Sequence, residues 1–184
     1  MFVCVHLLLN SSVFLSADGS SYETLIHFMK TAPFIPIMEV VLIALPIIFH
    51  GIYGIYIVYL AKNNPLKFTY YRNWAFYLQR ITAIIVVLFL VWHVYTLRLS
   101  GHHEAADVMN TLVGYLQNPL LFACYIIGVV AAIYHFANGL FTFCITWGIC
   151  VGDRAQKIFA VCAMLIFAAL SIFAIAILVK IAIL

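Results

Sequence analysis

The stretch LPIIFHGIYGIYIVYLAKNN, residues 45–64, is an apolar run that contains one histidine, His50, and ends in polar residues. An ionisable side chain within a helix that crosses a membrane is energetically costly, so it indicates a functional site. Three other apolar stretches carry one such histidine each: His6, His93 and His135. These four histidines, on four separate segments, decide which fold and function the sequence predicts.

The composition indicates a membrane protein. Of the 184 residues, 67% are hydrophobic and only 8% are charged, whereas soluble domains carry about 25% charged residues. The formal net charge of +3 is small and scattered, which argues against a nucleic-acid partner. None of the five cysteines forms a CxxC or CxxCH motif, which excludes covalent attachment of a c-type haem.

Five apolar segments predict an all-α membrane protein with a single domain, residues 1–184, built as a bundle of five transmembrane helices. The segments are residues 1–15, 33–61, 74–99, 119–150 and 158–184. The last four exceed the roughly 20 residues that cross a bilayer. The first reaches only about 22 Å as a helix, so we interpret it as a spanning helix truncated at its N-terminus. Pro46 is expected to bend the second helix, because proline removes a backbone hydrogen bond.

Basic residues indicate the orientation in the membrane. Five of the nine lysines and arginines lie in two connections, residues 62–73 and 151–157. The remaining connections are more acidic. The positive-inside rule therefore predicts that these two connections lie in the cytoplasm and that the C-terminus lies outside.

The histidines are expected at two depths. At about 1.5 Å per residue, His6 and His93 lie roughly 9–13 Å from the outer surface, and the other two lie roughly 16–20 Å from the cytoplasmic surface. This predicts two facing pairs, His6 with His93 and His50 with His135. Such pairs fit the iron of two b haems, bound by one imidazole on each face. The remaining histidines fall in outer loops and are expected to be solvated: His27, His102 and His103.

Four further residues are candidates for holding the two haems. Gly54 and Gly139 lie four residues after the two inner histidines, on the same helix face, where a missing side chain leaves flat space for a porphyrin. Arg80 and Arg98 are candidates to bind haem propionates near the inner and outer surfaces. The alternatives are ordinary helix packing for the glycines and surface-anchoring charges for the arginines.

Three segments resemble the cytochrome b558 family, the di-haem membrane anchors of Bacillus-type succinate dehydrogenases (succinate:menaquinone reductases). They are the stretch quoted above, YYRNWAFYLQRITAIIVVLFLVWHVY (residues 70–95) and IYHFANGLFTFCITWGI (residues 133–149). The spacing of histidine, glycine and aromatic residues agrees with the family over these stretches. The shorter HLLLN, residues 6–10, fits the ligand on the first helix.

The resemblance implies that His6, His50, His93 and His135 are axial ligands of two non-covalently bound b haems. It implies an iron–sulfur subunit on the cytoplasmic connections and a flavoprotein subunit that oxidises succinate in the tricarboxylic acid cycle. Electrons would pass through the inner and then the outer haem to menaquinone, in the plasma membrane of a bacterium. This chain would be an electron-transport subunit without the flavin site.

Two residues bear on the quinone chemistry. Glu39, near the outer end of the second segment, is a candidate proton carrier for quinone reduction, or else an interfacial residue that faces headgroups. Some di-haem fumarate reductases carry a glutamate two residues before the fourth ligand, where this chain has Ile133. That difference favours succinate oxidation over this type of fumarate reduction.

Other functions stay open on the sequence alone. One is the anchor of a related quinol:fumarate reductase. Another, of a different class, is a transporter whose histidines relay protons without haem, which is expected to show inverted repeats or broken helices. A haem-free structural anchor is a third, and it leaves the paired histidines unexplained.

Overall fold

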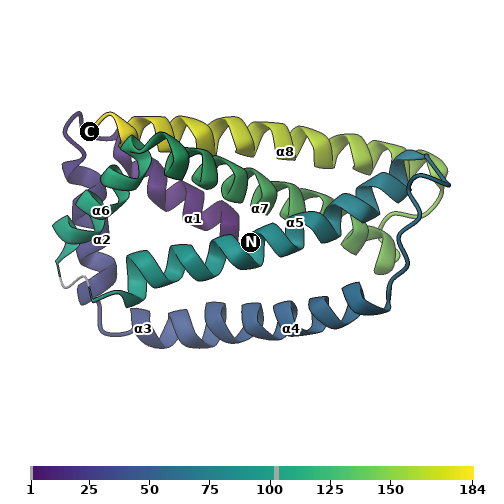
Figure 1. Ribbon diagram of the computed structural model, residues 1–184, viewed down its shortest axis with the longest axis horizontal. Helices are drawn as coiled ribbons and strands as arrows, with labels where there is room; N and C mark the ends of the chain where they lie inside the picture. The colour runs from purple at the N-terminus through teal and green to yellow at the C-terminus, as the bar shows by residue number, and fades with distance from the viewer. Residues whose placement is uncertain (1, 102–103) are drawn as a thin grey trace.

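The computed structural model describes residues 2–101 and 104–184, and nearly all of them are helical (Figure 1). Four helices are long and apolar enough to cross a membrane: Ile35–Leu60, Tyr71–Leu99, Pro119–Thr146 and Asp153–Ala182. A shorter apolar helix, Phe2–Phe14, precedes them. The predicted helical membrane bundle is confirmed, with the first segment as the short helix.

Two of the spans contain a π-helical turn. The first span joins α3 (Ile35–Met38), a π-helical turn (Glu39–Ala44) and α4 (Leu45–Leu60). The second joins α5 (Tyr71–Val94) to a π-helical turn at Tyr95–Leu99. π-helical turns are rare in proteins, and those that occur often lie at functional sites.

Pro46 lies in the first turn of α4, directly after the π-helical turn of that span. Proline has no N–H to donate and its ring collides with the carbonyl one turn earlier. The wider π-helical turn is therefore where the span accommodates the proline that the sequence places ahead of His50.

The other two spans are α7 (Pro119–Thr146) and α8 (Asp153–Ala182), which pack against each other, while α5 packs along α7. The short α1 (Phe2–Asn10), followed by a 3-10 turn, contacts both α7 and α8. Leu7, Tyr125 and Ile177 belong to the main hydrophobic core, which joins these helices near the end of the bundle that holds both α1 and the C-terminus.

Two connections that were predicted as outer loops are helices. They are α2 (Ser20–Thr31) and α6 (Ala105–Gln117), which lie across one end of the bundle in Figure 1. The buried residues of α6 recur at the spacing of one helix face: Ala105, Val108, Met109, Leu112 and Leu116. The prediction of loops was wrong because these helices are too short and too polar to read as spans.

This correction changes the place of one histidine. His27 lies on α2 and not in a loop, and its side chain is exposed, as a solvated residue should be. His102 and His103 lie outside the described residues. At the opposite end of the molecule, α8 begins at Asp153, so most of the predicted connection 151–157 is the start of a helix.

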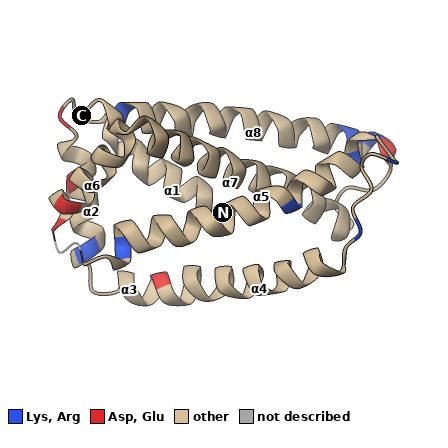
Figure 2. Ribbon diagram, viewed as in Figure 1, with Lys and Arg blue, Asp and Glu red and all other residues tan. Residues whose placement is uncertain are grey.

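Charges separate between the two ends of the bundle. Figure 2 shows that lysines and arginines gather where α4 is joined to α5 and where α7 is joined to α8. The end that carries α2 and α6 holds most of the acidic residues, together with a few basic ones. The molecule therefore has one basic end, which matches the two connections singled out in the sequence.

Candidate functional site

The structure brings the four histidines of the apolar segments together in two pairs. The ring centres of His6 and His93 lie 5.9 Å apart with an angle of 89° between the ring planes. Those of His50 and His135 lie 6.1 Å apart at 82°. The predicted pairing is confirmed. The second pair lies nearer the basic end and is named the inner pair, and the first lies nearer α2 and α6 and is named the outer pair, after the depths predicted from the sequence.

The spacing of both pairs leaves room for one metal ion between the rings. Two imidazoles that bind one metal from opposite sides, each through a bond of about 2 Å, have ring centres roughly 6 Å apart. T-shaped aromatic contacts span the same range of distances. Within the residues described, no group of three or more His, Cys, Asp or Glu side chains could hold a metal. Two histidines are what haem iron takes from a protein when the porphyrin supplies its other four ligands.

Gln79 on α5 holds the ring of His135 in the inner pair. The Nδ1 atom of His135 lies 3.2 Å from the backbone carbonyl oxygen of Gln79. A carbonyl can only accept, so Nδ1 carries the proton and Nε2 keeps a free lone pair. This is the tautomer that a metal ligand needs, and its partner is of the kind that orients such ligands.

His50 reaches the inner pair from a span that buries none of its residues. All three pieces of Ile35–Leu60 lack a buried side chain, whereas α5 buries two residues and α7 buries eight. In Figure 1 this span runs along one side of the bundle. A large flat group held between His50 and His135 would cover part of its inward face, so the arrangement fits a haem.

Arg80 lies on α5, next to Gln79, and is 6% exposed. Its Nη1 atom donates to the side-chain oxygen of Asn63, and its guanidinium lies 3.8 Å from the ring centre of Phe76. The Nη2 atom is buried without a hydrogen-bond partner among the described residues. A buried cationic donor of this kind calls for an anionic partner, and a haem propionate fits that requirement.

Aromatic rings hold the outer pair. Phe2 stacks on His6 with ring centres 5.4 Å apart, and Phe89 stacks on His93 at the same distance. The hydroxyl of Tyr125 lies 3.4 Å from Nδ1 of His93, a long contact for a hydrogen bond. Ring packing therefore fixes the outer pair, in contrast to the carbonyl contact of the inner pair.

Gly128 on α7 makes this packing possible. A Cβ atom at Gly128 would lie 2.9 Å from Cβ of Phe89 and would also collide with the Phe89 ring. Gly128 could not be selected from the sequence, because its importance comes from the contact with Phe89 on α5. It lets Phe89 sit between α7 and the ring of His93.

A hydrogen-bonded chain connects α2 to the helix that carries His6. The hydroxyl of Tyr22 donates to Oδ1 of Asn10 at 2.7 Å, and Nδ2 of Asn10 donates to the carbonyl of His6 at 2.7 Å. Burial raises the pKa of the Tyr22 hydroxyl, which therefore keeps the proton that it donates. The helix α2 thus helps to fix the position of His6.

Glu39 and Arg98 were predicted to have separate roles, and the structure pairs them. The Nη2 and Nε atoms of Arg98 lie 2.7 and 3.0 Å from the same carboxylate oxygen of Glu39. Each residue lies in one of the two π-helical turns. An ion pair therefore joins the two turns. Its arginine, Arg98, follows the ligand candidate His93 by five residues.

The two predicted pocket glycines have different surroundings. No atom of the described residues lies within 4 Å of a Cβ built at Gly54, so that position faces open space. A Cβ at Gly139 would lie 3.3 Å from the side-chain nitrogen of Gln79. The space beside Gly139 is thus shared with a side chain of α5, and the contribution of both glycines to haem pockets stays a prediction.

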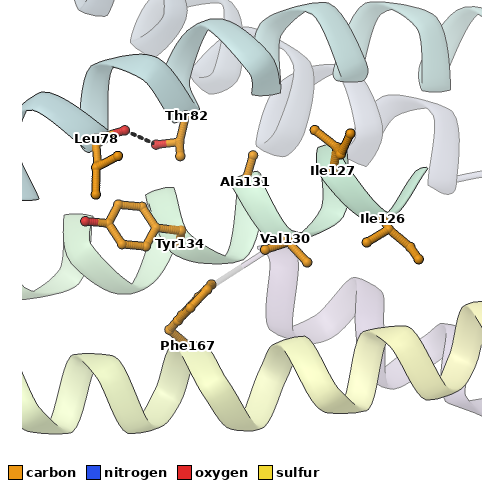
Figure 3. A pocket seen from close by; sticks show the side chains of 8 residues that line it. All are labelled: Leu78, Thr82, Ile126, Ile127, Val130, Ala131, Tyr134 and Phe167. Atoms are coloured by element: carbon orange, nitrogen blue, oxygen red, sulfur yellow. Dashed lines mark hydrogen bonds between the residues drawn. The ribbon is translucent and has the colours of Figure 1, made fainter. Parts of the chain in front are cut away.

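The structure also contains an apolar groove and a more polar cavity. An apolar groove of about 380 Å³ lies between α5, α7 and α8, and Figure 3 shows that its walls carry no charged side chain. Its lining residues are Leu78, Thr82, Ile126, Ile127, Val130, Ala131, Tyr134 and Phe167. A more polar cavity of about 550 Å³ opens at the basic end, and Lys62, Arg72 and Asn138 are among its lining residues.

Similarity to known proteins shows the family of this chain. The family model described as succinate dehydrogenase/fumarate reductase transmembrane subunit matches residues 61–174. The succinate dehydrogenase cytochrome b558 subunit of Bacillus subtilis (strain 168) is 39% identical over 171 residues, which are 93% of this chain and 84% of the relative. The chain belongs to this family of transmembrane subunits.

The family match places two of the four histidines in the shared region. Residues 61–174 include α5 with His93 and α7 with His135. The resemblance noted in the sequence is therefore confirmed at the level of the succinate dehydrogenase/fumarate reductase family. No solved structure matches the chain.

Proposed function

We propose that this chain is the cytochrome b subunit that anchors a succinate:quinone oxidoreductase in the bacterial plasma membrane. In this proposal it passes electrons from an iron–sulfur subunit to menaquinone. The observation that carries the proposal is the presence of two near-perpendicular imidazole pairs, with ring centres 5.9 and 6.1 Å apart, at two levels of one apolar bundle.

Each pair holds one b haem in this proposal, without a covalent bond to the protein. A bound haem supplies an iron centre that accepts and releases one electron. The chain would contribute the imidazoles that bind the iron, the tautomer of His135 that the Gln79 carbonyl fixes, and an apolar surround that excludes water. Arg80 binds a propionate of the inner haem, since its buried Nη2 needs an acceptor.

The basic end of the bundle faces the cytoplasm and docks the iron–sulfur subunit, which carries the flavoprotein subunit. This orientation follows from the positive-inside rule and places the C-terminus outside. The family name includes both succinate dehydrogenases and fumarate reductases. Ile133, in place of the glutamate of some di-haem fumarate reductases, supports succinate oxidation.

Quinone reduction takes place near the outer pair in this proposal, and it consumes two protons along with two electrons. Glu39 takes up a proton from the outer aqueous phase and passes it to the quinone, which returns it to the carboxylate form that Arg98 holds through the bonds described above. Arg98 is also near enough in the chain to His93 to serve a propionate of the outer haem.

The pigment content of the purified complex tests the haem assignment. We expect a reduced-minus-oxidised spectrum of b type and two haems for each copy of this chain. A colourless complex would exclude the proposal and would favour a haem-free proton relay or a structural anchor.

Replacement of Glu39 by glutamine tests the proton-carrier assignment. Glu39→Gln removes the group that takes up and releases the proton but keeps the side-chain size, so succinate-driven reduction of a menaquinone analogue should fall by about tenfold or more while both haem spectra persist. Glu23→Gln on α2 is the matched control at the same end of the molecule. Equal quinone turnover in the two variants would remove Glu39 from the mechanism.

A further inference from the structure

We infer that Gln79 is a positioning residue for the inner haem, because it fixes both the ring and the backbone of His135. The inference rests on the proposed function, since it assumes that His135 binds iron. Gln79 is an uncharged polar residue in the apolar span Tyr71–Leu99, where a polar side chain needs a partner.

Gln79 makes two contacts with His135, in opposite directions. Its backbone carbonyl faces Nδ1 of the imidazole at 3.2 Å, and its side-chain Nε2 donates to the backbone carbonyl of His135 at 2.9 Å. One residue on α5 thus constrains both the rotation of the ring and the position of the α7 backbone from which the ring projects.

The side-chain amide of Gln79 is itself fixed in orientation. Its Oε1 atom accepts from Nδ2 of Asn138 at 2.7 Å, and Asn138 is 1% exposed. Nδ2 of Asn138 also lies 3.3 Å from the carbonyl oxygen of Ala75. The amide of Gln79 therefore cannot exchange its oxygen and nitrogen without losing both bonds.

The glycine at position 139 leaves room for this arrangement. A Cβ atom there would lie 3.3 Å from Nε2 of Gln79, closer than most side-chain contacts. The sequence IYHFANGLF, residues 133–141, thus places the ligand, the amide partner and the small residue on one helix beside Gln79. This spacing gives His135, Asn138 and Gly139 a common partner.

The outer pair has no equivalent clamp among the described residues. Nδ1 of His93 faces the hydroxyl of Tyr125 at 3.4 Å, and stacked rings surround it. Hydrogen bonds to the histidines that bind a metal orient their rings, and they also tune the electronic properties of a haem. A change at Gln79 should therefore alter the inner haem alone.

The test compares Gln79→Met with Gln117→Met in the whole complex. Methionine keeps the length of the side chain but removes the amide. Gln117 at the end of α6 is a matched control. Its side chain also donates to a backbone carbonyl, but that carbonyl belongs to Ala182 and not to a histidine of either pair. The readouts are haem content and the electron paramagnetic resonance signal of each oxidised haem.

In Gln79→Met we expect the inner signal to shift or to split into several components, or the inner haem to be lost, while the outer signal keeps its position. Gln117→Met should leave both signals unchanged. Two unchanged signals in Gln79→Met, or an equal loss of both haems without any shift, would overturn the inference. A wild-type complex without haem would instead overturn the proposed function.

Asn138→Ala decides the question if Gln79→Met does not accumulate in the membrane. It removes the bond that orients the Gln79 amide and leaves the Gln79 backbone carbonyl in place. A shift of the inner signal alone would support the inference, and two unchanged signals would refute it.

Discussion

The inner and outer histidine pairs have nearly the same ring spacing, but different chemistry holds them. In the inner pair, the ring of His135 donates to the backbone carbonyl of Gln79, whose side chain donates to the backbone carbonyl of His135. Stacked aromatic rings, and the close approach of two helices at Gly128, fix the outer ring of His93. Similar ligand geometry thus rests on polar support in one pair and on apolar support in the other, so single substitutions should separate the two sites.

The partner histidines differ as well. His6 lies on the short helix α1. The next residue, Leu7, is buried in the core, and Asn10 at the end of the helix is bonded to Tyr22. His50 lies on the span Ile35–Leu60, in which no residue is buried. The protein itself fixes the outer pair on both sides, whereas the inner pair depends more on whatever lies between its rings.

The largest separation of the two sites is expected from Gly128→Ala. The added methyl group would collide with Phe89, and overpacking of this kind costs about 1–3 kcal/mol. Since every 1.4 kcal/mol is about tenfold in an equilibrium, the outer haem should be largely lost while the inner haem is kept. Haem quantification with low-temperature spectra measures both.

Gly114→Ala on α6 is the control for this substitution, because no atom of the described residues lies within 4 Å of a Cβ at that position. It should keep both haems. Loss of the inner haem in Gly128→Ala, or full retention of the outer one, would contradict the aromatic support of His93.

An intermediate effect is expected from Arg80→Gln. Reduction adds one negative charge to a haem, so removal of the buried guanidinium should lower the inner midpoint potential. We expect a shift of tens of millivolts, given that about 59 mV corresponds to 1.4 kcal/mol for one electron. A redox titration followed by absorbance measures it, with the exposed Arg154→Gln as control. A shift of the outer potential instead would place Arg80 at the wrong site.

The smallest effect is expected from Tyr22→Phe. It removes the hydrogen bond to Asn10 and should weaken the outer site by about 1 kcal/mol. The temperature at which the outer haem is released should fall by a few degrees, and that of the inner haem should not change. Tyr59→Phe, at an 85% exposed position, is the control. Equal release temperatures in wild type and Tyr22→Phe would show that α2 does not support His6.

Much of the architecture could be predicted because lipid imposes simple rules. Long apolar runs give spans, and one histidine at a given depth in each run gives pairs, so the contacts of His6 with His93 and of His50 with His135 followed from counting residues. The helix α6 was missed because a search for long apolar runs passes over a short amphipathic helix, although its buried residues repeat with a helical period.

The supporting residues could not be predicted in the same way. Gln79, Gly128 and the pairing of Glu39 with Arg98 all depend on contacts between helices that lie far apart in the sequence. A usable signal existed only for Gln79, since uncharged polar residues in apolar spans need a hydrogen-bond partner. A glycine in an apolar helix gives no indication of which side chain approaches it.

The most direct test of the two-site structure is an electron paramagnetic resonance comparison of the oxidised complex with its His50→Ala and His93→Ala variants. We expect two low-spin haem signals in the wild type, loss of one signal in His50→Ala and loss of the other in His93→Ala. If either variant, inserted in the membrane at wild-type amounts, kept both signals, or if both variants lost the same one, the assignment of one haem to each pair would be wrong.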